Sequence, residues 1–301
     1  MKLEDSLTLY RVTHRTTYRY EEEVSASYGQ MHLLPRTADG QACRSSRVVI
    51  EPTPDDLRER TDFFGNRAAF FAIHAHHTGL TVTTTSDVSV GRRNGLGLLG
   101  AQPWEQVRDR TAAPGDDGWE PVDFRLDSPL VAASPALAEY AGPSFTPGRP
   151  VLEALLDLAR RIHADFDYQA GSTSVTTTVG EVLMARTGVC QDFAHLALGC
   201  LRSLGLAARY VSGYLETVPP PGQERLQGAD VSHAWAALWV PGGGWVDVDP
   251  TNQQLVDDRY VTTPWGRDYA DVPPLKGVIF TKGLEHELDV VVDVVRLDDP
   301  G

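Results

Sequence analysis

The segment RTGVCQDFAHLALGCLRSLG, residues 186–205, contains the pattern on which the fold prediction depends. Its apolar residues recur at helical spacing, and Gly205 is typical of a helix end. The apolar face comprises Phe193, Leu196, Ala197, Cys200, Leu201 and Leu204. Cys190 falls in the first turn, where unpaired N–H groups and the helix dipole favour the thiolate and lower the pKa of a thiol. Cys190 is therefore a candidate nucleophile, although a buried, inert cysteine is the commoner interpretation of such a residue taken alone.

The composition is that of a globular protein with one large domain or two. The chain has 301 residues, of which 42% are apolar and 23% charged. Its 27 Lys and Arg face 41 Asp and Glu, which gives a net charge of −14. Such a surface repels phosphate groups, so we expect neither nucleic acid nor a membrane as partner.

The cysteines and the N-terminus indicate a reducing, cytoplasmic location. Cys43, Cys190 and Cys200 are widely spaced and form neither a disulfide framework nor a CxxC pair. Residues 1–10, MKLEDSLTLY, carry charges where a signal peptide needs an apolar stretch. No run approaches the roughly 18–20 apolar residues of a membrane span.

The first third of the chain predicts strands. Residues 7–20, 47–52, 67–77 and 80–90 are rich in Thr, Tyr, Val and Phe and are separated by turn-forming residues. We therefore expect a β-rich, sandwich-like domain over residues 1–100. Pro and Gly are frequent in the loops expected at 91–100, 111–119 and 142–150, so residues 101–150 are predicted to be a linker with short helices, one of them at 134–141.

Helices precede strands in the second half, which predicts an α+β core over 151–260. Residues 151–166 have helical apolar spacing, and Thr178 with Glu181 forms a capping box that opens a short helix. Strands are expected at 208–215, 232–240 and 244–249. A late apolar strand at 287–297, within a C-terminal extension over 261–301, could pair with either domain.

A histidine and an aspartate are expected to meet across a hairpin. The loop 241–243 is short and rich in glycine, and sets Val240 opposite Gly244. This register places His233 diagonally across from Asp249, roughly 7–8 Å away between backbones, whereas Asp247 lies near 13 Å at about 3.3 Å per residue. A four-residue loop would put His233 and Asp249 on opposite faces.

Other chemistry is weakly indicated. His74, His76 and His77 could suggest a metal site, but no nearby cysteine and few carboxylates complete a ligand set. No phosphate-binding glycine motif occurs in a strand–helix context. We therefore expect neither metal nor cofactor.

Three segments together resemble the bacterial transglutaminase-like family, a branch of the papain-like cysteine enzymes. They are GVCQDFAHLALGCLRSLGLAARYVSGYL (188–215), SHAWAALWVPGGGWVDVDPTN (232–252) and GRDYADVPPLKGV (266–278). YRVTHRTTYRYEEEVSASYGQMHLLPR (10–36) is similar to the β-rich N-terminal region that accompanies this core. The resemblance implies a cysteine-bearing helix packed on an antiparallel sheet, and a catalytic triad of Cys190, His233 and Asp249.

The chemistry implied is acyl transfer at an amide bond through a thioester, with a peptide or protein as substrate. Hydrolysis by a cysteine peptidase or amidase is our leading hypothesis. Protein-glutamine cross-linking and a non-catalytic binding module are the alternatives. The backbone N–H of Cys190 is one expected oxyanion donor. Side chains that could border the site or provide the second donor are Gln191, Trp235, Tyr168 and Asp268.

Further residues of the matched motifs are expected to have structural roles. Asp192 and His195 are three residues apart on the predicted helix, where a structural hydrogen bond is the favoured interpretation. Asp268 and Tyr269 either border the site or tie the C-terminal segment to the core, and we slightly favour the second role. The sequence does not indicate the oligomeric state.

Overall fold

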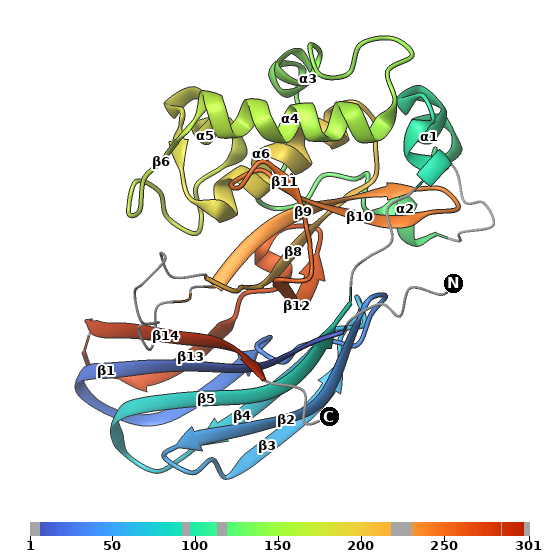
Figure 1. The fold of residues 1–301 in the computed structure, drawn as a ribbon. Coiled ribbons are helices and arrows are strands. Elements are labelled where there is room, and N and C mark those ends of the chain that lie inside the picture. Colours follow the sequence, from blue (N-terminus) through green and yellow to red (C-terminus); the bar gives the residue numbers. More distant parts are fainter. Residues whose placement is uncertain are drawn as a thin grey trace, which may run out of the picture.

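The computed structural model describes residues 7–91, 97–112, 119–217, 230, 232–283 and 285–297. A β-rich unit lies against one face of a second sheet, and helices cover the other face (Figure 1). The predicted loops 91–100 and 111–119 fall partly outside the described residues, at 92–96 and 113–118. Among the described helices, none is long and apolar enough to cross a membrane.

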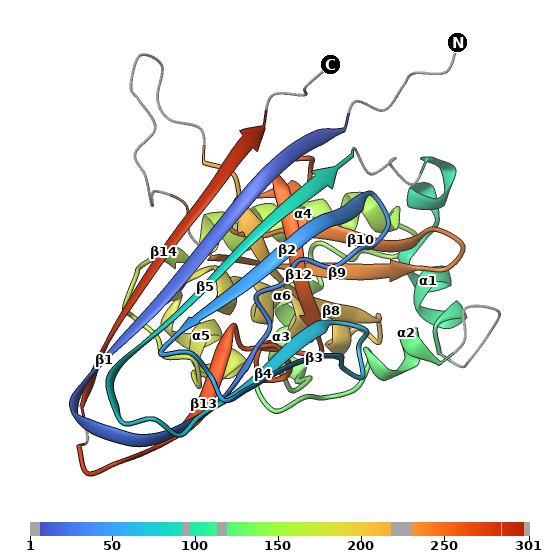
Figure 2. The ribbon, with the colours of Figure 1, turned by 90° about the horizontal axis from the view of Figure 1, so that it is seen from below.

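The N-terminal unit is one antiparallel sheet of seven strands. One long strand runs through both halves of this sheet. The first part of β1 (Thr8–Met31) pairs with β5 and β14, and its last part pairs with β4 and β13. The register shifts between Arg19 and Val24, where the sheet curls and its halves diverge (Figure 2). The other strands are β2 (Gln41–Glu51), β3 (Asp56–Thr61), β4 (Arg67–Ile73), β5 (His77–Val90), β13 (Leu275–Thr281) and β14 (His286–Leu297). The predicted sandwich-like unit is thus formed by one curled sheet.

The late apolar strand belongs to this N-terminal sheet. β14 runs antiparallel to the first part of β1, from Leu9 opposite Leu297 to Tyr20 opposite His286. The sequence left open which domain this strand joins, and its pairing with β1 shows that it joins the N-terminal sheet.

The second sheet has the strand order β11-β10-β9-β8-β12 and supports the helical layer. Its strands are β8 (Ala208–Leu215), β9 (Ser232–Val240), β10 (Gly244–Asp249), β11 (Gln254–Leu255) and β12 (Tyr260–Gly266). The helices are η1 (Gly97–Ala101), α1 (Trp104–Arg110), α2 (Glu120–Asp123), α3 (Pro135–Ala141), α4 (Val151–Asp165), α5 (Val179–Ala185), α6 (Cys190–Ser203) and η2 (Tyr269–Asp271). Two short parallel strands, β6 (Asp167–Tyr168) and β7 (Thr187–Gly188), flank the start of α6. This arrangement is the α+β fold class expected from the sequence.

The cysteine-bearing helix α6 is buried on all sides. It packs on β8 and β9 with one face and against α3, α4 and α5 with the other, so every residue from 192 to 202 is buried. Gly199 permits this contact, because a Cβ atom there would lie 2.9 Å from Leu137 Cδ1 of α3. The single apolar face predicted from the sequence therefore understates the burial of this helix.

Side-chain amides join the two sheets at the edge strand β12. Gln41 of β2 donates to the Thr262 carbonyl at 2.8 Å and accepts the Thr262 N–H at 2.8 Å. Asn66 donates to the Trp265 carbonyl at 2.8 Å and accepts the Trp265 N–H at 2.9 Å. The two amides thus satisfy backbone groups that an edge strand would otherwise leave unpaired.

Candidate active site

The three cysteines have different surroundings. Cys190 is the first residue of α6 and is half-buried, so its thiol is partly accessible. Cys200 in the same helix is fully buried, which raises the pKa of its thiol to about 12. Cys43 is half-buried on β2 beside Arg67, whose Nη1 lies 3.7 Å from the sulfur. Only Cys190 combines access to solvent with a helix N-terminus.

The start of α6 is fixed by Asp192. Its Oδ2 accepts hydrogen bonds from the Val189 N–H at 2.8 Å and from Thr173 Oγ1 at 2.6 Å. Gly188 allows this close packing, because a Cβ atom there would lie 2.8 Å from Asp192 Cβ. The structure does not contain the predicted hydrogen bond between Asp192 and His195. Asp192 instead satisfies an unpaired N–H at the helix start, as carboxylates commonly do.

The β9–β10 hairpin has the register predicted from the short loop. Val240 pairs with Gly244, and Ala237 pairs with Asp247. Gly244 has a φ of +79°, which the tight three-residue connection requires. His233 and Asp249 consequently lie on the same side of the hairpin, with His233 Nε2 2.7 Å from Asp249 Oδ2.

Asp249 is fully buried and its carboxylate accepts five hydrogen bonds. Oδ2 accepts from His233, from the Tyr260 hydroxyl at 2.7 Å and from Asn252 Nδ2 at 2.6 Å. Oδ1 accepts the backbone N–H groups of Thr251 at 2.8 Å and Asn252 at 3.2 Å. Burial alone would raise the pKa of Asp249, but the hydrogen bonds and charge of His233, with Asn252 and Tyr260, outweigh it and lower this pKa. The carboxylate is thus held ionised in the protein interior.

The hydrogen bond to Asp249 determines which nitrogen of His233 faces the thiol. Because Nε2 is bound to the carboxylate, Nδ1 is the ring nitrogen left for Cys190. Burial lowers the pKa of His233, but hydrogen bonds and charges of Asp249 and Cys190 outweigh burial and raise the pKa to about 10. The surroundings therefore stabilise an imidazolium between two acidic groups, which is the arrangement that a thiolate nucleophile requires.

Trp235 and Asp247 form a second layer behind this pair. The Trp235 indole N–H donates to Asp247 Oδ1 at 2.8 Å, and its buried ring lies 6.2 Å from the His233 ring. The Trp235 N–H is therefore already committed and does not serve as the oxyanion donor for which it was a candidate. Asp247, the carboxylate that the register argument disfavoured, anchors the tryptophan.

The other candidate lining residues occupy different positions. Tyr168 is partly exposed and packs edge-on against Phe193, with 6.2 Å between the ring centroids. Its partial burial, and then the negative charge of Cys190, raise the pKa of its hydroxyl. Gln191 Nε2 lies 3.4 Å from the Val175 carbonyl at the surface. Tyr168 thus lies beside the thiol. Gln191 follows Cys190 in the sequence, and its side chain contacts the loop that contains Val175.

Asp268 belongs to the packing of the C-terminal segment. It is fully buried and accepts the backbone N–H groups of Leu130 at 2.7 Å and Ala270 at 2.9 Å. The Tyr269 N–H next to it donates to His195 Nε2 at 3.1 Å. Asp268 and Tyr269 therefore tie this segment to the core, which is the role that the sequence analysis slightly favoured.

The histidines considered for a metal site each have a separate partner. His74 Nδ1 lies 3.1 Å from Asp55, and His76 Nδ1 lies 2.9 Å from Glu23. His77 Nε2 lies 2.8 Å from the Ser27 hydroxyl. Each histidine thus contacts a different residue of the N-terminal unit.

Sequence reasoning missed three residues of the site. Tyr260 and Asn252 hold Asp249, and the fully buried Tyr210 of β8 lies close enough to Cys190 for its charge to raise the tyrosine pKa, after the larger effect of burial. The turn after Asp249 could have been found, because an aspartate at the start of a turn often accepts backbone N–H groups that follow it, as Asp249 does from Thr251 and Asn252. Tyr260 and Tyr210 lie on other strands, and no local signal indicates their contacts.

Comparison with known proteins identifies families that match both parts of the chain. Residues 10–89 match the family model of the bacterial transglutaminase-like N-terminal region, and residues 139–250 match that of the transglutaminase-like superfamily. An uncharacterized protein of Mycobacterium tuberculosis is 49% identical over 296 residues, which cover 96% of this chain and 93% of that protein. A Pseudomonas aeruginosa protein-glutamine gamma-glutamyltransferase is 39% identical over 69 residues, which are 23% of this chain and 10% of that protein.

A solved structure has the same fold over nearly the whole chain. It is described as a "putative cysteine protease" from Cytophaga hutchinsonii and superimposes with a TM-score of 0.77 at 21% identity, covering 98% of this chain and 93% of that chain. The chain thus belongs to the bacterial transglutaminase-like family, with a core of the fold that cysteine-dependent enzymes of this superfamily share.

Proposed function

We propose that the protein hydrolyses an amide bond of a peptide or protein through a thioester on Cys190. The observation that carries this proposal is the hydrogen bond from His233 Nε2 to the buried Asp249, because it leaves Nδ1 for a partly accessible thiol at a helix start. The free thiols Cys43, Cys190 and Cys200 are consistent with the reducing, cytoplasmic compartment that we expect for such an enzyme.

The reaction follows the logic of a nucleophile, a base and an orienting carboxylate. His233 Nδ1 takes the thiol proton, and the Cys190 sulfur forms a bond with the amide carbonyl carbon. His233 then gives the proton to the departing amine as the C–N bond breaks, which leaves a thioester. Water, deprotonated by His233, attacks the thioester and releases the acid and the thiol. Asp249 holds the ring in orientation and stabilises its charged form.

The first turn of α6 supplies the electrostatic stabilisation of the intermediate in this proposal. Backbone N–H groups at a helix start lack partners within the helix and can bind a developing oxyanion. The Cys190 N–H is the donor that we assign. Tyr168, beside the thiol, is the remaining tyrosine candidate for the second donor.

Transfer to an amine is the alternative reaction of the same thioester. Its support is the similarity over 69 residues to the Pseudomonas aeruginosa protein-glutamine gamma-glutamyltransferase. Hydrolysis remains the leading proposal because water is always present as an acceptor, whereas an amine must be bound.

The first experiment separates an enzyme from a binding module. We expect iodoacetamide to label Cys190 faster than Cys200 in the native protein, and the His233→Ala substitution to slow the labelling of Cys190 strongly. Peptide mapping by mass spectrometry reports both sites in one sample. Equal labelling rates in the wild type and the variant would refute the proposed base.

The second experiment separates the two reactions. A glutamine-containing peptide is incubated with the protein, with and without a labelled primary amine, and ammonia and incorporated label are measured. Ammonia release without incorporation supports hydrolysis, and incorporation supports transfer. Cys190→Ala is the control and should abolish both signals.

A further inference from the structure

A cavity of about 230 Å³ lies inside the curled N-terminal sheet and shares no lining residue with the candidate triad. It lies between the two halves of the curled sheet, where the partners of β1 change from β5 and β14 to β4 and β13 (Figure 2). Its walls come from β1, β5, β13 and β14, with Tyr18, Tyr20, Leu80, Leu275, Ile279 and His286 as the main side chains. It adjoins the hydrophobic core of this sheet, since Tyr18, Tyr20 and Leu80 belong to both.

Two facing glycines let the strands beside the cavity pack closely. Gly29 of β1 pairs directly with Gly277 of β13. A Cβ atom on Gly29 would lie 2.2 Å from the Phe71 ring, and one on Gly277 would lie 2.5 Å from the Tyr28 carbonyl oxygen. Larger residues cannot occupy these positions without a shift of the sheet, so the close packing of this wall depends on the two glycines.

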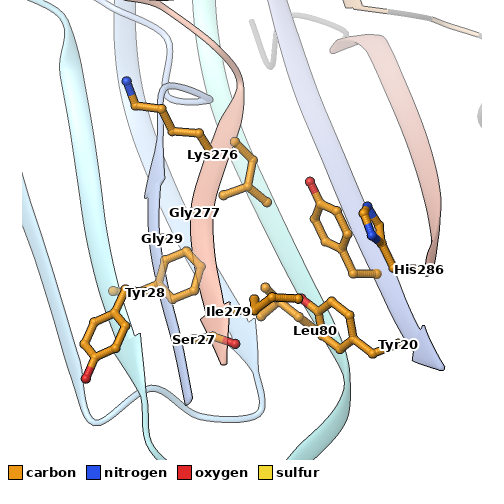
Figure 3. A pocket seen from close by; sticks show the side chains of 12 residues that line it. Tyr20, Ser27, Tyr28, Gly29, Leu80, Lys276, Gly277, Ile279 and His286 are labelled. Carbon is orange, nitrogen blue, oxygen red and sulfur yellow. The ribbon is translucent and has the colours of Figure 1, made fainter. Parts of the chain in front are cut away.

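Aromatic rings form one wall of the cavity. Tyr18 and Tyr20 are stacked at 6.2 Å between ring centroids, and His286 lies 5.6 and 6.4 Å from them. Figure 3 shows Tyr20 and Leu80 grouped with Ile279, and Lys276 pointing away from them. The cavity therefore presents a mainly apolar and aromatic wall, and the Lys276 side chain, which also lines it, points away from these rings.

Carboxylates surround the mouth at the end formed by Tyr20 and His286. Glu21, Glu285 and Glu287 line an adjoining hollow that shares Tyr20 and His286 with the cavity, and the side chain of Glu287 is 81% exposed. Arg19 lies there too, but its guanidinium is paired with Glu287 at 3.7 Å. The mouth is thus acidic and attracts basic groups. A second copy of this chain, with its net charge of −14, is a poor occupant.

An edge strand beside the cavity can pair with an extended segment. Within the described part of the chain, β13 pairs with β1 alone, so its other edge presents backbone groups to solvent. Val278 and Phe280 on this strand are 61% and 55% exposed, and little charge protects the edge. Extended peptides add to such edges with alternate side chains inserted into pockets.

We infer that the cavity binds an extended peptide segment that inserts one bulky apolar side chain and carries lysine or arginine beside it. A volume of about 230 Å³ accommodates one bulky side chain, and the adjoining hollow can take the residues that flank it. The aromatic wall receives the apolar group, the glutamates pair with the basic neighbours, and the edge of β13 bonds the backbone.

The test measures binding of labelled peptides to the full chain by fluorescence anisotropy. The chain carries Cys190→Ala, so the result does not depend on the proposed hydrolysis. We expect the probe Lys-Lys-Phe-Lys-Lys to bind about ten-fold or more tightly than Lys-Lys-Gly-Lys-Lys, from burial of the aromatic ring. Glu-Glu-Phe-Glu-Glu should not bind. Equal affinity of the Phe and Gly probes would overturn the inference.

Two sets of variants locate the binding. Ile279→Trp fills the cavity and should weaken the Phe probe at least ten-fold, whereas Val49→Trp, at an exposed position on β2 outside the proposed site, should not. Thermal unfolding checks that both variants are folded. Two results would overturn the inference. One is equal affinity of the Phe probe for the wild type and for folded Ile279→Trp, and the other is a dimer of this chain that the probe does not dissociate.

A second pair of variants tests the acidic mouth without altering the core. The double change Glu21→Gln and Glu285→Gln should weaken the Phe probe several-fold and flatten its salt dependence. The control removes two exposed carboxylates elsewhere, with Glu51→Gln and Glu139→Gln, and should leave affinity nearly unchanged. An equal loss in both doubles would show that only the net charge matters and would refute the site.

Discussion

Replacing Asp249 with asparagine removes the charge that holds the His233 proton. Two unit charges about 4 Å apart interact by about 4 kcal/mol at an effective dielectric constant of 20, which corresponds to about 3 pKa units. His233 has its pKa raised to about 10 while the carboxylate lies 2.7 Å from Nε2. In the Asp249→Asn variant we therefore expect the pKa of His233 to fall to roughly 7.

Two assays report this change without knowledge of the substrate. NMR of the histidine Cε1–H groups in ¹³C-labelled protein follows the titration of His233 directly. The alkylation rate of Cys190 by iodoacetamide, measured from pH 6 to 11, follows the thiolate that the imidazolium stabilises. We expect slower alkylation in the variant near pH 8, and a difference that closes above pH 10. Asp247→Asn is the matched control, since it removes a buried carboxylate that bonds Trp235 instead.

The stability of the variant should depend on pH in a defined direction. The raised pKa of His233 contributes stability that is fully present below about 6.5 and is lost as the pH rises through about 10. The lowered pKa of Asp249 contributes stability that is present above about 3.9 and is lost as the pH falls further. The free energy of unfolding of the wild type should thus exceed that of the Asp249→Asn variant most between about pH 3.9 and 6.5, where both contributions are present. A His233 that still titrates above pH 9 in Asp249→Asn, or an equal shift in Asp247→Asn, would refute the pairing.

Three further substitutions test packing by urea unfolding. Cys200→Ser buries a hydroxyl in the core and should lower the free energy of unfolding by about 1–3 kcal/mol. The alkylation rate of Cys190 should stay the same, and a slower rate in the folded variant would contradict this interpretation. Gln41→Ala should cost about 2–3 kcal/mol because both backbone groups of Thr262 lose a buried partner, and an unchanged midpoint would contradict it. Gly180→Ala, with open space around its Cβ, should stabilise α5 by about 0.5–1 kcal/mol, so a loss would show unseen strain.

The hairpin that carries His233 could be predicted because local rules fix it completely. A three-residue loop with glycines specifies the pairing of Val240 with Gly244, and the two-residue period of strands then places every side chain. The capping box of Thr178 and Glu181 is present for the same reason, since both partners lie within one turn. These predictions needed no knowledge of the tertiary structure.

The N-terminal sheet could be predicted in outline but not in extent. β1 continues to Met31 past three glutamates that weaken the alternating pattern, because its residues beyond them pair with β13 and β4. β3 consists entirely of exposed residues and exists only through its pairing with β4. Non-local hydrogen bonding overrides local preference in both strands, so the sequence pattern alone cannot reveal them.

The contact between Tyr260 and Asp249 links the N-terminal sheet to the candidate site. β12 lies at the edge of the second sheet, and Gln41 of the N-terminal sheet holds its backbone at Thr262, two residues from Tyr260. The Tyr260 hydroxyl then donates to the carboxylate that orients His233. Residues separated by more than 200 positions therefore fix one imidazole ring, and neither the strand order nor the amide contacts that connect them have a local signal in the sequence. The N-terminal sheet is in this respect part of the support of the site, because without it the strand that carries Tyr260 would have an unpaired edge.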